Sequence, residues 1–86
     1  MYTIEFLPAA QKELKQLDFT VQKQLKAKMI LLAENPERLK NNIKPLKGKF
    51  AGKFRLRVRE YRIVFQIIEA KVLILIVRIG HRKEIY

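Results

Sequence analysis

The sequence predicts an α+β domain of the order β-α-α-β-β-β, in which an N-terminal strand and a helical hairpin pack on a twisted, mainly antiparallel sheet. Three observations support this fold class. Apolar residues recur at helical spacing between positions 8 and 34. From position 53 onward they either alternate or form continuous apolar runs, as in strands. The length of 86 residues suits one hydrophobic core, so we expect a single domain, residues 1–86.

The N-terminal half is predicted to contain one strand and two helices. Residues 2–6 are rich in β-branched and aromatic side chains, and Pro8 suits the first turn of a helix. The apolar stripe of that helix is Ala10, Leu14 and Leu17. Asp18 is expected to cap a second helix, which Asn35 and Pro36 end. The stripe of the second helix is Val21, Leu25, Met29 and Leu32. The short connection predicts an antiparallel helical hairpin.

The C-terminal half is predicted to contain a long loop and three strands. Residues 38–52 are rich in Lys, contain Pro45, Gly48 and Gly52, and are expected to form the loop. Residues 53–59 alternate strictly, with Phe54, Leu56 and Val58 on one face and Lys53, Arg55, Arg57 and Arg59 on the other. Residues 62–68 predict the next strand. Residues 72–79 are largely apolar, so this last strand should lie centrally with both faces covered.

The charge is concentrated in the second half of the chain. The sequence has 19 Lys and Arg against 8 Asp and Glu, a net charge of +11. Residues 1–37 are neutral in sum, and all the Arg residues lie beyond them. Such a surface favours an anionic partner, and nucleic acid is preferred because Arg matches phosphate geometry. An acidic protein would fit the same surface, and the Lys residues on the helices are read as a solvated face.

Several functional classes are excluded by composition. The chain has no Cys, which excludes a disulfide scaffold, a thiol nucleophile and a thiolate metal site. One His and scattered carboxylates predict no metal site, and no phosphate-binding Gly loop is present, so no cofactor is expected. The longest apolar run is too short to span a bilayer, and no signal peptide opens the chain. A soluble cytoplasmic protein without a membrane partner is therefore expected.

Two segments carry the candidate chemistry. The four cations of residues 53–59 repeat about every 7 Å along one strand face, close to the phosphate spacing of a single nucleic-acid strand. Arg62 is expected near this face across the hairpin. Gly80, His81 and Arg82 follow the central strand, where side chains project from the end of the sheet. Tyr86 could pack on the core, stack on a base or assist proton transfer.

These residues resemble a known family. The predicted element order, the segment Lys53-Phe-Arg-Leu-Arg running into Tyr61-Arg-Ile-Val-Phe, and the ending Gly80-His-Arg-Lys-Glu-Ile-Tyr are similar to the RelE toxins of the RelE/ParE toxin–antitoxin superfamily. The resemblance covers essentially the whole chain. It implies a RelE-like fold and the toxin component of a type II toxin–antitoxin system. It further implies an endoribonuclease, or mRNA interferase, that cleaves mRNA in the ribosomal A site and inhibits translation.

The resemblance also implies partners and site residues. The partners would be a RelB-like antitoxin, the ribosome with its rRNA, and mRNA. The expected catalytic residues are Lys53, Arg55, Arg62, His81, Arg82 and Tyr86. The expected RNA-binding residues are Lys47, Lys49, Arg57 and Arg59. Two positions depart from some family members, which have Lys where this chain has Arg55 and His81.

The residue types fit metal-independent cleavage by the 2′-hydroxyl of the RNA. Fixed cations would stabilise the dianionic transition state, and Arg62 and Arg82 are expected to do so. Arg cannot serve as the base, because its pKa exceeds 12. Lys53 and His81 both remain candidates. Two other functions stay open: a ParE-like toxin that binds DNA gyrase without catalysis, and a nucleic-acid-binding module without activity.

Overall fold

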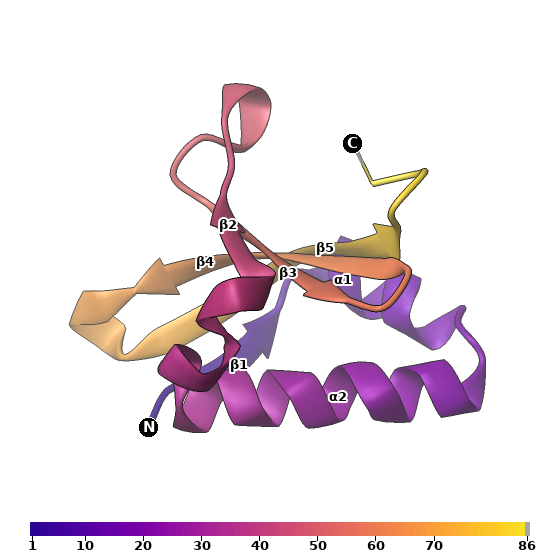
Figure 1. Cartoon of the computed structure of the whole chain (residues 1–86), viewed down its shortest axis with the longest axis horizontal. Helices are drawn as coiled ribbons and strands as arrows, with labels where there is room; N and C mark the ends of the chain where they lie inside the picture. The colour runs from indigo at the N-terminus through magenta and orange to yellow at the C-terminus, as the bar shows by residue number, and fades with distance from the viewer. Residues whose placement is uncertain (86) are drawn as a thin grey trace.

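A computed structural model describes residues 1–85 and has the predicted α+β class (Figure 1). Within these residues the strands are β1 (Thr3–Phe6), β2 (Ile43–Pro45), β3 (Phe54–Val58), β4 (Tyr61–Ile68) and β5 (Leu73–His81). The helices are α1 (Pro8–Lys15) and α2 (Phe19–Glu34). Short 3-10 segments η1 (Pro36–Asn42), η2 (Gly48–Phe50) and η3 (Glu69–Lys71) lie between them.

The described strands form one five-stranded sheet in the order β1-β5-β4-β3-β2. The β1 strand runs parallel to β5, and the other neighbours are antiparallel. The apolar run after residue 72 therefore has a strand on each side, as predicted. An irregularity between Val64 and Phe65 shifts the register of β4 against β5. Beyond it, Arg62 lies opposite Gly80 and Tyr61 opposite His81.

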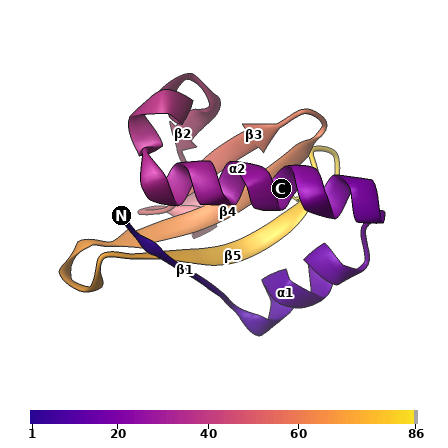
Figure 2. The same ribbon diagram turned by 90° about the horizontal axis from the view of Figure 1, so that it is seen from below.

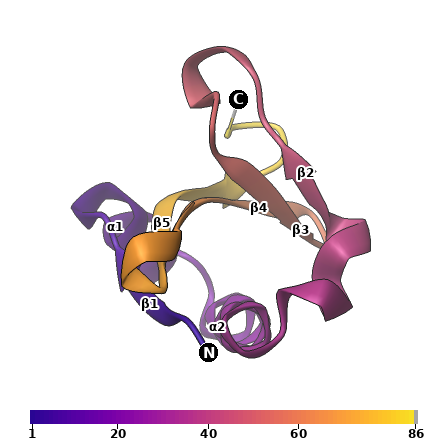
Figure 3. The same cartoon turned by 90° about the vertical axis from the view of Figure 1, so that its left-hand side faces the viewer.

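Helix α2 covers one face of the sheet (Figures 2 and 3). The predicted stripe faces inward, because Leu25, Met29 and Leu32 are buried in the core and Val21 is half-buried. They pack in one cluster with the sheet residues Leu56, Ile63, Phe65, Ile74 and Ile76. Full burial of such side chains contributes about 1.5–3 kcal/mol each. The helix ends at Glu34, as Asn35 and Pro36 predicted.

Helix α1 packs mainly against β5 rather than against α2 (Figure 3). Ala10 and Leu14 of its predicted stripe are buried in the core, and the carboxylate of Glu13 adds polar contacts to β5. Its Oε1 accepts the Ile79 N–H at 2.9 Å, and its Oε2 accepts the Arg78 Nε–H at 2.9 Å. The hydrogen bond to Glu13 raises the pKa of Arg78 above its ordinary value. Glu13 thus provides an acceptor on the part of β5 that extends beyond β1, and α1 packs there instead of against α2 as the predicted hairpin would require.

Two local predictions were wrong. Residues 38–52 are not one loop, because Ile43–Pro45 pair with β3 as an edge strand flanked by 3-10 segments. Pro45 is tolerated there because an edge strand has one side without a neighbour. Asp18 occupies the N-cap position of α2, but its side chain makes no capping hydrogen bond. Within residues 1–85, no helix is long and apolar enough to cross a membrane.

Candidate functional site

The sheet face opposite α2 carries a group of cations that we call the cationic face: Lys44, Arg55, Arg57 and Arg62. Leu56 and Val58 of β3 are buried toward α2, so the alternating residues Arg55 and Arg57 point to the other side. The strand register then pairs Lys44 with Arg55 and Arg57 with Arg62. Four positive side chains from three adjacent strands therefore share one surface.

This arrangement of like charges lowers the free energy of unfolding. Residues directly opposite in an antiparallel pair have Cβ atoms about 4.5–5.5 Å apart, and like charges at that distance are destabilising. The cationic face contains two such pairs, Lys44–Arg55 and Arg57–Arg62. A bound anion would turn the repulsion into attraction. The register thus supports anion binding more strongly than the sequence alternation does.

The guanidinium of Arg55 gives a second indication that this surface binds an anion. Its side chain is half-buried, and Nη1 is the one buried side-chain nitrogen or oxygen without a hydrogen-bond partner in the described part of the chain. A buried donor without an acceptor costs free energy, and charged donors cost more than neutral ones. A phosphate oxygen is the kind of acceptor that a guanidinium fits best.

Two segments project from the same side of the sheet and border the cationic face (Figures 1 and 3). One is the arm, residues 46–53, which carries the exposed Lys47 and Lys49. Gly52 allows the arm to turn back, since its φ of 85° is a left-handed conformation. The other is the tail, residues 82–85, held by buried Ile85 over Gly80.

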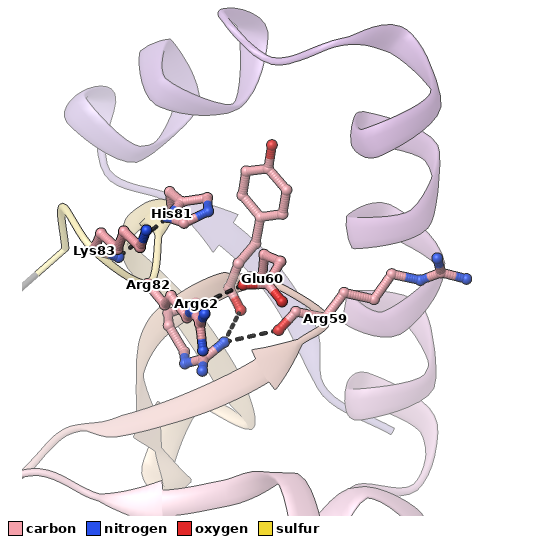
Figure 4. A network of polar contacts seen from close by, with 7 residues as sticks. Arg59, Glu60, Arg62, His81, Arg82 and Lys83 are labelled. Atoms are coloured by element: carbon pink, nitrogen blue, oxygen red, sulfur yellow. Dashed lines mark hydrogen bonds and ion pairs between the residues drawn. The ribbon is translucent and has the colours of Figure 1, made fainter.

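The turn between β3 and β4 brings Arg62 and Arg82 together (Figure 4). Arg62 Nη1 donates to the carbonyl oxygens of Arg59 at 3.0 Å and Tyr61 at 2.9 Å. The backbone N–H of Arg82 donates to the carbonyl oxygen of Glu60 at 2.8 Å. Arg82 Nε also lies 2.7 Å from Glu60 Oε2. Three successive residues thus hold the two arginines that were expected to contact phosphate.

His81 is oriented differently from the arginines. It pairs with Tyr61 across the β4–β5 ladder, and the two rings meet edge to face with centroids 5.7 Å apart. Because adjacent residues of a strand point to opposite faces, His81 lies on the side of the sheet away from Arg62. Its Nδ1 accepts the Lys83 N–H at 3.2 Å within the tail. Figure 4 shows the imidazole turned away from the two guanidinium groups.

The predicted alternation of residues 53–59 holds for Arg55 and Arg57 but fails at Arg59. Arg59 lies in the turn with a φ of 55°, and its side chain points away from Arg62 and Arg82 (Figure 4). It lines a hollow with Gln24 and Lys28 of α2, which Arg57 and Val58 of β3 also border. Lys53 is half-buried at the base of the arm, where its backbone bonds to Leu46 and Phe50. Tyr86 lies outside the described residues.

Two residues of this surface were missed from the sequence. Lys44 falls in the segment that the sequence predicts to be a loop, and only the pairing of β2 with β3 places it opposite Arg55. Glu60 is not among the predicted site residues, although it is one of only three acids after position 37 and lies two residues from Arg62. An isolated acid in such a cationic stretch is the feature of the sequence that could have indicated a contact with a neighbouring arginine. Across residues 1–85, no three His, Cys, Asp or Glu side chains group as metal ligands would.

The fold and the cationic face define a small basic α+β protein whose antiparallel sheet presents clustered arginines. Residues 4–86 match the family described as the ParE toxin of the type II toxin–antitoxin system parDE. The chain is 33% identical to the mRNA interferase toxin RelE of Escherichia coli over 99% of this chain and 90% of that protein. It therefore belongs to the RelE/ParE superfamily of type II toxins and is RelE-like by homology.

Solved structures agree with this assignment. A chain of the intact Escherichia coli RelBE toxin–antitoxin complex superposes with a TM-score of 0.77 at 32% identity, covering 94% of this chain and 96% of that chain. A chain of the archaeal RelE–RelB complex from Pyrococcus horikoshii reaches a TM-score of 0.79 at 18% identity, covering 96% and 97%. The second likeness shows that the fold persists where most of the sequence differs.

Proposed function

We propose that this toxin is a ribosome-dependent endoribonuclease that cleaves mRNA in the A site and so inhibits translation in the cytoplasm. The single observation that carries the proposal is the convergence of Arg62 and Arg82 on one turn beside the cationic face. Two guanidinium groups at one place suit a phosphodiester that gains negative charge as it reacts. Similarity to RelE of Escherichia coli supports the same reaction.

In the proposed reaction, the RNA 2′-hydroxyl attacks the adjacent phosphorus, and the bond to the 5′-oxygen breaks. Arg62 and Arg82 stabilise the charge on the pentacovalent phosphate, and Arg55 supplies a further donor to its oxygens. Lys53 is the preferred base, because it immediately precedes the strand that carries Arg55, whereas His81 lies on the other side of the sheet. We propose that Tyr86 stacks on a base or assists proton transfer.

The remaining cations are assigned to binding. Lys47 and Lys49 on the arm and Arg57 on β3 would contact phosphates of mRNA or rRNA. Arg59 would do so from the hollow beside α2 rather than from the cationic face. The ribosome would supply the in-line geometry that these residues cannot impose alone. A RelB-like antitoxin is the proposed inhibitory partner, as in the RelBE complex of Escherichia coli.

Toeprinting on translating ribosomes tests the activity. The wild-type toxin is expected to cut within A-site codons, and Arg62→Ala with Arg82→Ala is expected to lower cleavage by at least about a hundredfold. The matched control is Arg38→Ala with Lys71→Ala, which removes the same charge from exposed positions elsewhere. Cleavage by the site variant at the control rate would contradict the assignment of the two arginines.

A second candidate is a gyrase-binding toxin without catalysis, favoured by the match to the ParE family description. A DNA supercoiling assay separates the two. Inhibition of gyrase without any cleavage of ribosome-bound mRNA would establish the second function. We prefer the first, because a protein that only binds gyrase has no need for Arg62 and Arg82 to converge.

A further inference from the structure

We propose that Glu60 is a positioning residue that orients the Arg82 guanidinium for the phosphate, an inference that rests on the proposed function. Glu60 holds Arg82 at two points. Its carbonyl oxygen accepts the Arg82 backbone N–H at 2.8 Å, and its carboxylate contacts Nε at 2.7 Å. The first contact extends the β4–β5 ladder by one residue, and the second fixes the side chain.

The ion pair is poorly placed to stabilise the fold. The side chains of Arg82 and Glu60 are 52% and 57% exposed, and exposed pairs contribute little to folding. Orientation is a better explanation. An Arg side chain has several rotatable bonds, and a charge-assisted bond to Nε removes much of that freedom before RNA binds. The same turn anchors Arg62 through the carbonyls of Arg59 and Tyr61, so one turn sets both guanidinium groups.

The hydrogen bonds of this turn support the assignment. Arg59 adopts a φ of 55°, a value that residues other than Gly rarely adopt. In this conformation its carbonyl oxygen lies within hydrogen-bond distance of Arg62 Nη1. The next residue, Glu60, presents both of its acceptors to Arg82. A two-residue hairpin turn itself requires a positive φ, and in this turn three carbonyl oxygens also accept hydrogen bonds from Arg62 and Arg82.

A carboxylate that positions Arg82 also weakens RNA binding, and this second effect distinguishes positioning from other roles. The negative charge of Glu60 lies next to the surface that would attract RNA, so it weakens binding. Removing the carboxylate should therefore tighten the complex and slow the reaction at the same time. A residue that merely stabilises the fold would lower activity without tightening binding, and a residue that merely competes with RNA would speed the reaction when removed.

The kinetic experiment compares wild type, Glu60→Ala and Glu60→Gln on ribosomes with a defined A-site codon. Glu60→Ala is expected to lower kcat about tenfold, the scale of one charge-assisted hydrogen bond, and to lower KM about threefold. Glu60→Gln keeps an oxygen acceptor for Nε, so its kcat should stay within about threefold of wild type while KM falls as in the Ala variant. Glu69→Ala is the charge-matched control, since Glu69 lies in η3 at the far end of β4. It should leave kcat unchanged.

An NMR measurement separates this inference from the proposed function. Exchange of the Arg82 Nε–H with solvent should be slow in wild type and Glu60→Gln and fast in Glu60→Ala. Equal exchange in wild type and Glu60→Ala, or an unchanged kcat in Glu60→Ala, overturns the positioning role. If wild type cleaves no ribosome-bound mRNA while the exchange rates differ as expected, Glu60 still orients Arg82 and the endoribonuclease function is what fails.

Discussion

Arg57 and Arg62 lie directly opposite each other on β3 and β4, so two guanidinium groups share one cross-strand position on an open sheet face. The pair lies inside the ladder, between Val58–Tyr61 next to the turn and Leu56–Ile63 on the other side. The repulsion between the two cations destabilises the fold, whereas their positive charge favours the proposed RNA binding. A substitution at this pair should therefore change the free energy of unfolding and the RNA affinity in opposite directions.

Arg57→Thr should raise the free energy of unfolding and weaken RNA binding together. Removing one of two opposed cations relieves repulsion worth roughly 0.2–1 kcal/mol, and Thr is a good strand residue. Urea unfolding measures the first effect. For RNA, the slope of log K against log salt should fall by about 0.7 if Arg57 contacts one phosphate. An unchanged slope would remove Arg57 from the interface.

Ile85→Ala should loosen the tail and impair cleavage. Ile85 is 2% exposed and packs over Gly80, beside the backbone that carries Arg82. Loss of a buried Ile side chain costs about 2–5 kcal/mol in a core, and a loss within that range is expected. Thermal unfolding gives the stability change. Ile85→Val is the control, and it should retain most of both stability and activity.

Glu13→Ala should destabilise the fold without touching the cationic face. The change leaves the Ile79 N–H without its acceptor and breaks the contact with Arg78. An unsatisfied backbone donor costs about 1–3 kcal/mol, and we expect the lower end because the Arg78 side chain is 37% exposed. Glu13→Gln should recover part of the loss, because the amide oxygen still accepts one hydrogen bond. A fall in RNA affinity in Glu13→Ala protein that remains folded would contradict the separation of the two sites.

Val72→Gly should stabilise the protein. Val72 is an exposed β-branched residue with a φ of 49°, a left-handed conformation that glycine adopts at much lower cost. The gain should be about 1 kcal/mol, after the greater entropy of glycine in the unfolded chain is subtracted. Denaturant unfolding measures it. Activity should not change, because Val72 joins η3 to β5 at the end of the sheet away from Arg62.

Local spacing in the sequence determined most of the secondary structure. The stripe Leu25, Met29 and Leu32 predicted the buried side of α2, and the alternation Leu56, Val58 predicted the buried face of β3. Both follow from fixed helical and strand periods, which need no knowledge of distant residues. The concentration of Arg after position 37 can also be seen in the sequence, and anion binding by that half stays a prediction. The three residues Ile43–Pro45 were missed because so short a strand carries no period and forms only by pairing with β3.

Only the tertiary structure decided which cations share a surface. Lys44 joins Arg55 because β2 pairs with β3, and Arg82 joins Arg62 because a two-residue turn presents the acceptors of Glu60. His81 and Arg59, equally plausible in the sequence, point elsewhere. The reason is that strand register and turn conformation are set by contacts across the sheet, and a shift of one residue in either moves a side chain to the opposite face.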